Sequence, residues 1–406
     1  MDEASYKTTA FGRAARRPGD RWAFTYYLPN ELPRELELSP ATVLVLSDAD
    51  SALGLLNGLG RLIPEPTMLL GPLLAQEALA SSRIEGTKAS LSDVLKAEVI
   101  SIEPVSDDVM EVVRYVDANK KALELVKTLP ISQRLVSLTH AELMTGVRGE
   151  ERPPGQLRRS PVWVGHGDAT PDTARFVPPL PEHLPELLTD WELFINDPSP
   201  RLPILVRCAL MHYQFETIHP YLDGNGRIGR LLVGLMLIQA GRLFTPILYL
   251  SGYLEAHRQE YYDRLQAVRE VGDVEGWINF FLRAVSAAAK DAEQRAGRLI
   301  QLREKYYSDC RLDQSRVSAL IPLIFSNPFL TAKRVQDAVG VTDQGARNLL
   351  NRATDYGWIA RHGTVGRGGA LYWAARDVLR VVESPIAYLA QGNARIESTE
   401  SGLALT

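Results

Sequence analysis

A twelve-residue stretch, His219 to Arg230, constrains the fold of this chain more than any other. It combines a histidine, an aspartate, an asparagine, three glycines and two arginines, and the apolar run 231–238 follows it directly. Glycines let the backbone turn sharply and approach a ligand closely. If the apolar run is a helix, the N–H groups of the loop lie at its N-terminus, where the helix dipole favours an anion.

Arg227 and Arg230 are cations at the unfavourable end of that predicted helix. Each costs up to about 1 kcal/mol there if no anion is bound. A phosphate would reverse the sign of this effect. The stretch therefore predicts a phosphate-binding loop with a histidine beside it.

Three other interpretations of the loop fit less well. Residues 224–229 match the dinucleotide fingerprint Gly-x-Gly-x-x-Gly, but that fingerprint follows a strand, whereas residues 205–218 have a helical pattern. A Walker loop needs Lys-Ser/Thr after its glycines, and this loop lacks them. A plain turn between two core helices rarely needs a histidine, an aspartate and two arginines together.

Composition is that of an ordinary soluble globular chain of 406 residues, enough for two or three domains. The net charge of −4 gives no general attraction to nucleic acid or anionic membrane. The acidic start has no apolar signal segment, and residues 231–250 are too interrupted to span a membrane. Cys208 and Cys310 have no partner cysteine at metal or redox spacing. We therefore expect a cytoplasmic protein without membrane contact.

The hydrophobic pattern predicts a mainly α fold. Helical spacing covers 40–63, 69–85, 90–146 and most of 185–307, with one long helix over 286–305. Residues 150–180 interrupt it with prolines and glycines. Within them, 162–164 and 174–177 are predicted to form a β-hairpin flap. Residues 1–40 show little periodicity, and Leu28–Pro33 is predicted to be an extended strap.

Residues 311–376 have the pattern of a separate winged helix-turn-helix domain. Thr331 and Thr342 are predicted to cap two helices on either side of the turn Gly340-Val341. Two strands, 358–360 and 370–373, then flank a Gly/Arg-rich tip. The pattern fits DNA binding and protein interaction equally well, because its excess of basic side chains is modest. The basic side chains that we counted are Lys333, Arg334, Arg347, Arg352, Arg361 and Arg367.

The loop resembles the active-site motif of the Fic domain family of protein adenylyltransferases, usually His-x-Phe-x-Asp/Glu-Gly-Asn-Gly-Arg-x-x-Arg. This chain departs from the motif once, with Tyr221 where phenylalanine is usual. Residues 25–105 also resemble the N-terminal segment of many bacterial Fic proteins. The resemblance covers roughly Tyr26 to Phe281.

The resemblance implies transfer of AMP from ATP to a Ser, Thr or Tyr hydroxyl of a target protein. His219 would be the general base, and Asp223 would bind Mg²⁺ between the α- and β-phosphates. The implied phosphate-binding residues are Gly224, Asn225, Gly226, Arg227 and Arg230. Glycine at 226, where a kinase-like subgroup carries lysine, favours nucleotidyl transfer over phosphoryl transfer.

The family pattern also assigns two neighbouring regions. Tyr261 matches one of a family Tyr-Tyr pair, so it is either a nucleotide contact or a core aromatic residue. The flap residues Val162, Trp163, Val164 and Gly165 would dock the target as an added strand. His212 lies at helical spacing before His219 without an apparent third ligand, and we interpret it as structural.

Ser81 to Gly86 fits the family's inhibitory pattern Ser/Thr-x-x-x-Glu-Gly/Asn. Glu85 is an anion at the unfavourable C-terminal end of its predicted helix, with Ser81 one turn earlier. Glu85 and Arg230 are thus two unfavourably placed charges of opposite sign. We expect Glu85 to hold Arg230 and to block the ATP γ-phosphate, against the alternative of an exposed glutamate with no partner.

The sequence therefore predicts five parts: an inhibitory N-terminal segment (1–105), a Fic core (106–285), a connecting helix (286–310), a winged helix (311–382) and a tail (383–406). The expected function is adenylylation of a target protein and of the chain itself. Two alternatives stay open: removal of AMP with Glu85 activating water, and a DNA- or protein-binding regulator. A homodimer is also compatible with the sequence.

Overall fold

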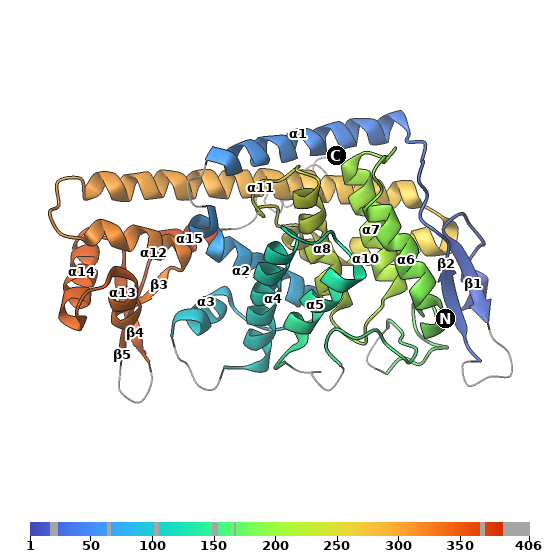
Figure 1. Cartoon of the computed structure of the whole chain (residues 1–406), viewed down its shortest axis with the longest axis horizontal. Helices are drawn as coiled ribbons and strands as arrows, with labels where there is room; N and C mark the ends of the chain where they lie inside the picture. The colour runs from blue at the N-terminus through green and yellow to red at the C-terminus, as the bar shows by residue number, and fades with distance from the viewer. Residues whose placement is uncertain are drawn as a thin grey trace, which may run out of the picture. The chain divides into compact units, whose positions relative to one another are not determined.

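The computed structural model describes residues 1–16, 23–62, 66–100, 105–147, 153–165, 168–365 and 370–384 (Figure 1). Within them the chain is mainly helical, with two small antiparallel sheets, as the sequence predicts. The longer helices are α1 (Pro40–Leu62), α2 (Pro66–Ile84), α3 (Leu91–Val99), α4 (Asp107–Leu125), α5 (Gln133–Met144), α6 (Leu184–Ile195), α7 (Ile204–Ile218), α8 (Asn225–Gln239), α9 (Ser251–Ala256), α10 (Arg258–Val271), α11 (Val274–Asp309), α12 (Leu320–Ser326), α13 (Ala332–Val339), α14 (Asp343–Asp355) and α15 (Arg376–Glu383). The strands are β1 (Gly12–Arg16), β2 (Thr25–Pro29), β3 (Phe329–Thr331), β4 (Ala360–Val365) and β5 (Ala370–Ala374), and short 3-10 helices cover Glu3–Ser5, Pro181–His183 and Val317–Ala319.

The chain forms two compact units whose boundaries do not follow the sequence in order. The first comprises residues 1–54, 117–246 and 253–286, and the second comprises 55–116, 247–252 and 287–406. Helices α1, α4, α9 and α11 each contribute residues to both units. The predicted connecting helix 286–310 is therefore the later part of α11, which begins twelve residues earlier, at Val274.

Helices α6, α7 and α8 form the centre of the first unit, where α7 contacts α6 on one side and α8 on the other (Figure 1). Helix α7 is buried along nearly its whole length, because its sequence is apolar on every face. A glycine lets α8 approach it: a Cβ at Gly229 would come within 2.7 Å of Glu216 Oε1. This close contact fixes the two helix ends that meet at the loop 219–224.

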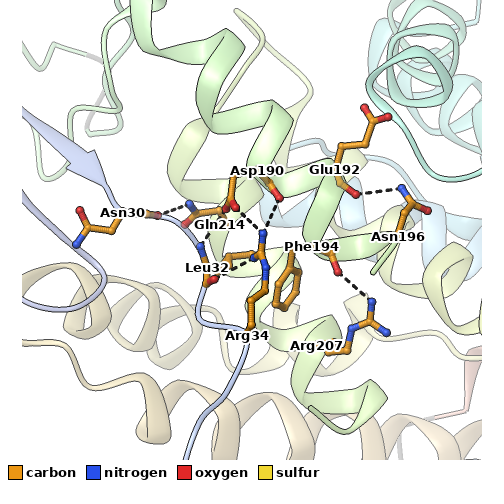
Figure 2. Close-up of polar contacts among 9 residues, drawn as sticks. All are labelled: Asn30, Leu32, Arg34, Asp190, Glu192, Phe194, Asn196, Arg207 and Gln214. Carbon is orange, nitrogen blue, oxygen red and sulfur yellow. Dashed lines mark hydrogen bonds and ion pairs between the residues drawn. The ribbon is translucent and has the colours of Figure 1, made fainter. Parts of the chain in front are cut away.

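The N-terminal residues are more ordered than their weak periodicity predicted. Strands β1 and β2 pair antiparallel, and Tyr27 N–H donates to Val177 O at 2.9 Å. The strap that follows is held by helices α6 and α7 (Figure 2). Leu32 N–H and the Arg34 guanidinium both bind the Asp190 carboxylate, at 3.0 and 2.5 Å. Long-range polar contacts, which leave no periodic signal in a sequence, order this segment.

The second unit contains two short helices, α13 and α14, and then the strands β4 and β5, in the order that the sequence predicts. Thr331 Oγ1 accepts from Arg334 N and Thr342 Oγ1 accepts from Gly345 N, so both predicted caps are confirmed. Strands β4 and β5 form the wing, and β3, which sequence reasoning missed, adds a third strand in the order β3-β5-β4. Residues 366–369 of the predicted wing tip, including Arg367, and most of the tail, 385–406, lie outside the described residues.

The predicted flap is smaller than a hairpin of two strands. Residues 162–164 and 174–177 meet at a single antiparallel bridge, Val164 with Phe176, whose two hydrogen bonds measure 2.8 and 3.2 Å. Prolines at 161, 178 and 179 lack the N–H groups that would extend the ladder on the side that leads away from the flap tip. The pairing direction was predicted correctly, and the strand lengths were not.

Candidate active site

His219 lies at the junction between α7 and the loop, in an unusual backbone conformation. It follows the last residue of α7 with φ 50° and ψ 62°, and within the described residues it is the only non-glycine with positive φ. The left-handed region costs a non-glycine residue about 1 kcal/mol or more, and such outliers cluster at functional sites. The side chain is half-buried. Sequence reasoning identified this histidine but could not foresee its conformation.

The loop after His219 is closed by the Asn225 side chain. Its amide oxygen accepts from Tyr221 N–H and its amide nitrogen donates to Tyr221 O, both at 2.9 Å. Asn225 is 2% exposed. Its side chain therefore holds the loop together, and its backbone N–H is the group that could reach a ligand. The predicted phosphate contact of Asn225 stays a prediction.

Helix α8 begins at Asn225, so the predicted anion site at a helix N-terminus has a structural basis. Gly224 caps the helix with φ 75°, and the first helical hydrogen bond runs from Ile228 N–H to Gly224 O at 3.0 Å. A side chain at Gly224 would strain this conformation and approach Met144 Sδ to 3.1 Å. The N–H groups of the first turn have no carbonyl partner within the helix.

Arg227 is a buried cation with unused donors. Its side chain is 6% exposed, and neither Nε nor Nη1 has a hydrogen-bond partner within the described part of the chain. Nη2 lies 3.5 Å from Asp223 Oδ1. A buried guanidinium with orphaned donors is costly unless a ligand completes it. This donor set fits an anion with several oxygens, such as a phosphate. Arg230, one turn later, is also buried.

Asp223 combines an exposed carboxylate with a fixed backbone. Oδ1 accepts from Gly224 N–H at 2.7 Å, while 38% of the side chain remains exposed. Mg²⁺ is usually held by one or two carboxylates together with substrate phosphates and water. No group of three or more His, Cys, Asp or Glu side chains that could hold a metal occurs in the described residues. A partly exposed carboxylate next to a helix N-terminus fits Mg²⁺ bound in this shared way.

His140, which sequence reasoning missed, holds Asp223 from the opposite side. Gly155 N–H donates to His140 Nδ1 at 2.9 Å, so the proton is on Nε2, which donates to Asp223 O at 2.9 Å. The ring stacks on Tyr221 with a centroid distance of 3.8 Å. Tyr221, the one departure from the family motif, is thus buried against an imidazole. The signal in the sequence was one histidine in a helical run, which nothing distinguished from a core residue.

Tyr261 and His212 lie in the core. His212 Nε2 and Tyr261 Oη are 2.9 Å apart, and both residues are 1% exposed or less. This confirms the structural role predicted for His212. For Tyr261 the contact favours the core alternative that the sequence left open, and a direct nucleotide contact remains a proposal.

The flap lies in the first unit, and the predicted inhibitory segment lies in the second. Trp163 and Val164 are about 40% exposed, and Trp163 Nε1 donates to Ala169 O at 2.7 Å. In the second unit, Ser81 is fully buried in α2, and Glu85 is exposed one residue beyond the last helical residue. The chain turns there through Gly86 at φ 102°. Glu85 and Arg230 belong to different units, so their pairing remains a proposal.

The fold and the site define a helical domain with a tight loop between α7 and α8, and this domain is similar to known proteins. Residues 43–124 match the model of the Fic/DOC family N-terminal region, and residues 130–237 match that of the Fic/DOC family. Over these residues the chain belongs to the Fic/DOC family, as its motif predicted.

Curated relatives include two protein adenylyltransferases. One from Aedes aegypti is 37% identical over 127 residues, which are 31% of this chain and 22% of that protein. One from Caenorhabditis elegans is 33% identical over 135 residues, 33% of this chain and 23% of that protein. The chain thus spans less than a quarter of the length of these relatives. A crystal structure of a Fic family protein from Desulfovibrio desulfuricans G20 matches with a TM-score of 0.51, 23% identity, 84% coverage of this chain and 97% of that one, which supports the shared fold.

Two buried histidines predict that stability falls in mild acid. Burial lowers the pKa of His140 to about 4 and that of His212 to about 3, whereas an unfolded histidine titrates near 6.5. Above pH 6.5 both histidines are neutral in the folded and the unfolded chain, and the free energy of unfolding has its full value. As the pH falls below 6.5, the unfolded chain takes up protons that the folded chain does not, so the free energy of unfolding decreases. At pH 4.5 each histidine should lower the free energy of unfolding by about 3 kcal/mol relative to neutral pH.

Urea unfolding at pH 7.5 and 4.5 measures this loss. His140→Gln should lose less stability between the two pH values than the wild type, while the exposed His362→Gln should follow the wild type. An equal pH response of His140→Gln and wild type would show that His140 is not the titrating group.

Proposed function

We propose that this chain transfers AMP from ATP to a Ser, Thr or Tyr hydroxyl of a target protein, and to itself. The observation that carries the proposal is the buried, incompletely bonded Arg227 beside the α8 N-terminus, eight residues after a half-buried histidine in a strained turn. This arrangement offers an anion site and a base on one loop. The names of the related adenylyltransferases support the same chemistry.

The residues of the loop divide the reaction between them. The His219 imidazole takes the proton of the target hydroxyl, whose oxygen attacks the α-phosphorus of ATP. The new O–P bond replaces the bond to the bridging oxygen of the β-phosphate, and pyrophosphate leaves. The N–H groups of Asn225 and Gly226 face the developing charge, and Arg227 and Arg230 hold the remaining phosphates.

Asp223 is the residue that would hold Mg²⁺. When bound, this ion neutralises charge on the phosphates. The contribution of the chain itself is orientation: Asp223 is fixed by Gly224 N–H to its carboxylate and by His140 to its carbonyl. The exposed edge at Trp163 to Gly165 would receive the target backbone as an added strand, which positions the hydroxyl with little side-chain selectivity.

The experiment that tests the function compares ATP labelled at the α or the γ position. With Mg²⁺ and either a cell extract or the chain alone, protein should gain label only from α-labelled ATP. Transfer from γ-labelled ATP would mean phosphoryl transfer and would refute the proposal. No transfer from either position, by the wild type and by a Glu85→Gly variant, would refute it too.

We also propose that Glu85 inhibits the reaction in cis by binding Arg230 in place of the γ-phosphate, with Ser81 orienting the glutamate. Its support is electrostatic. Glu85 lies just past the C-terminal end of α2 and Arg230 lies in the first turns of α8, so each charge opposes its helix dipole. Pairing relieves both, and ATP would compete with Glu85 for the same guanidinium.

The reverse reaction is a second candidate. In it Glu85 activates water, which releases AMP from a modified protein. Incubation with a pre-labelled target distinguishes the two directions: loss of label that requires Glu85 favours removal, whereas gain of label that Glu85 restrains favours addition.

A binding role for the winged unit is a further candidate. Residues 311–376 carry nine lysines and arginines against four aspartates, and helix α14 exposes Gln344, Arg347, Asn348 and Asn351 along one face. Several of its cations are already paired, such as Arg347 with Asp343 at 2.8 Å, which leaves protein docking or a homodimer contact as alternatives. Duplex DNA binding should weaken steeply with salt and survive His219→Ala.

No helix in the described residues is long and apolar enough to cross a membrane. A cytoplasmic location fits the function proposed here, since ATP and many protein targets occur there.

A further inference from the structure

Arg158 is a buried arginine whose side chain binds main-chain carbonyls. Its Nε donates to His219 O at 2.8 Å, and its Nη2 donates to Ile218 O at 3.2 Å and to Pro179 O at 2.6 Å. Nη1 donates to Ser160 O at 3.3 Å, and its own backbone N–H donates to Pro220 O at 3.0 Å. The residue is 3% exposed. Its neighbour Arg159 is exposed.

This cation is placed where a helix end can stabilise it. Burial lowers the pKa of Arg158 to about 10, so the side chain stays charged at neutral pH. No carboxylate pairs with it within the described residues. Its charge is offset by the carbonyls of Ile218 and His219, at the C-terminal end of α7, where the helix dipole favours a cation. The same two carbonyls belong to the turn in which His219 takes its left-handed conformation.

The other contacts of Arg158 lead to the flap. Ser160 lies two residues before the first flap segment, and Pro179 lies two residues after the second. One planar guanidinium therefore binds both ends of the flap and the main chain of the histidine. Such a fork of donors needs arginine, because a lysine has a single nitrogen and no fixed plane.

We propose that Arg158 is a positioning residue for AMP transfer: it holds the main chain of His219 in its strained turn and aligns it with the flap that receives the target. This proposal rests on the proposed function. The hydrogen bonds of the Arg158 side chain go to residues outside the Asp223–Arg230 part of the loop. Its loss should therefore lower kcat and leave the binding of ATP unchanged.

The chain offers a matched control in Arg207. This arginine is also buried and also binds carbonyls at the end of a helix, Phe194 O at 2.9 Å and Ile195 O at 2.7 Å, where α6 ends (Figure 2). Within the described part of the chain, its hydrogen bonds go to neither the loop nor the flap. Arg158→Lys and Arg207→Lys thus remove the same kind of interaction at two different helix ends.

The activity test measures kcat and KM for ATP with Arg158→Lys, Arg207→Lys and wild type, all in the Glu85→Gly background, together with calorimetric binding of ATP. Arg158→Lys should lower kcat by about a hundredfold, because small displacements of a catalytic group have effects of that size. KM and ATP binding should stay within about twofold. Arg207→Lys should lower the melting temperature about as much as Arg158→Lys does, and it should leave kcat unchanged.

Adding His219→Ala to Arg158→Lys separates positioning from general damage. If Arg158 acts through the histidine, the double variant should be no slower than His219→Ala alone. A further hundredfold loss in the double variant, or an equal loss of kcat in Arg207→Lys, would overturn the proposal.

Hydrogen exchange tests the same proposal without any activity. The His219 amide, bonded to Phe215 O at 2.9 Å, should exchange at least about tenfold faster in Arg158→Lys than in wild type. In Arg207→Lys the faster amide should instead be that of Asn196, bonded to Glu192 O at 3.1 Å. Unchanged exchange at His219 would refute the positioning role even if the chain transferred no AMP, and a failed labelling assay with the expected exchange would refute only the proposed function.

Discussion

Replacement of His219 by alanine is expected to lower AMP transfer by a factor of about a hundred to ten thousand, the usual contribution of a general base. Alanine removes the imidazole while the left-handed backbone and the Arg158 contact to His219 O remain. Binding of ATP should therefore stay close to that of the wild type. Label transfer from α-labelled ATP, measured in the Glu85→Gly background, gives the rate, and calorimetry gives the affinity.

His219→Gly provides the control for folding. Glycine adopts φ 50° without strain, so this variant should be as stable as wild type or more stable, by up to about 1 kcal/mol. It should be as inactive as the alanine variant. Activity retained in either variant would remove His219 from the reaction, and a loss of stability in the glycine variant would contradict the strained turn.

Glu85→Gly is expected to increase self-labelling by at least about tenfold, which corresponds to about 1.4 kcal/mol of competition removed from the nucleotide site. The physical reason is the proposed exchange of partners at Arg230, where the γ-phosphate replaces a carboxylate. Glu85→Gln, which keeps the size of the side chain and removes its charge, should have a similar effect. Label incorporated from α-labelled ATP over time is the measurement.

Two controls test whether the effect of Glu85→Gly is specific to Glu85 and acts through Arg230. Lys88→Ala changes an exposed residue in the same turn after α2 and should leave labelling unchanged. If the inhibition acts through Arg230, Glu85→Gly should raise labelling much less in an Arg230→Ala background. An inactive or unchanged Glu85→Gly variant would contradict inhibition, and loss of AMP removal in that variant would instead favour the reverse reaction.

The motif predicted the family and the start of α8 after Gly224, because its residues are contiguous. Glycines, arginines and an aspartate within a few positions restrict the backbone and the ligand together, and Gly224 and Arg227 are placed as expected. The helix caps at Thr331 and Thr342 were predictable for the same reason, since a cap depends on residues three positions apart.

Interactions between distant segments were not predictable in this way. The pattern of residues 1–40 gave no sign of the pairing of β1 with β2, nor of the Asp190 contacts that hold the strap. Nothing in the sequence shows that the side-chain amide of Asn225 binds the main chain of Tyr221. The flap was expected to be a hairpin, and its prolines limit it to one bridge.

Arg158 and Arg159 show the difference between what the local sequence predicts and what contacts with distant segments decide. They are adjacent, chemically identical and set in the same Pro- and Gly-rich segment, so the sequence by itself determined only that two cations precede the flap. The tertiary structure decided that Arg158 is buried against the carbonyls of Ile218 and His219 and that Arg159 faces solvent. The physical reason is that α7 ends beside this segment, and an unsatisfied helix end selects the donor that can reach it.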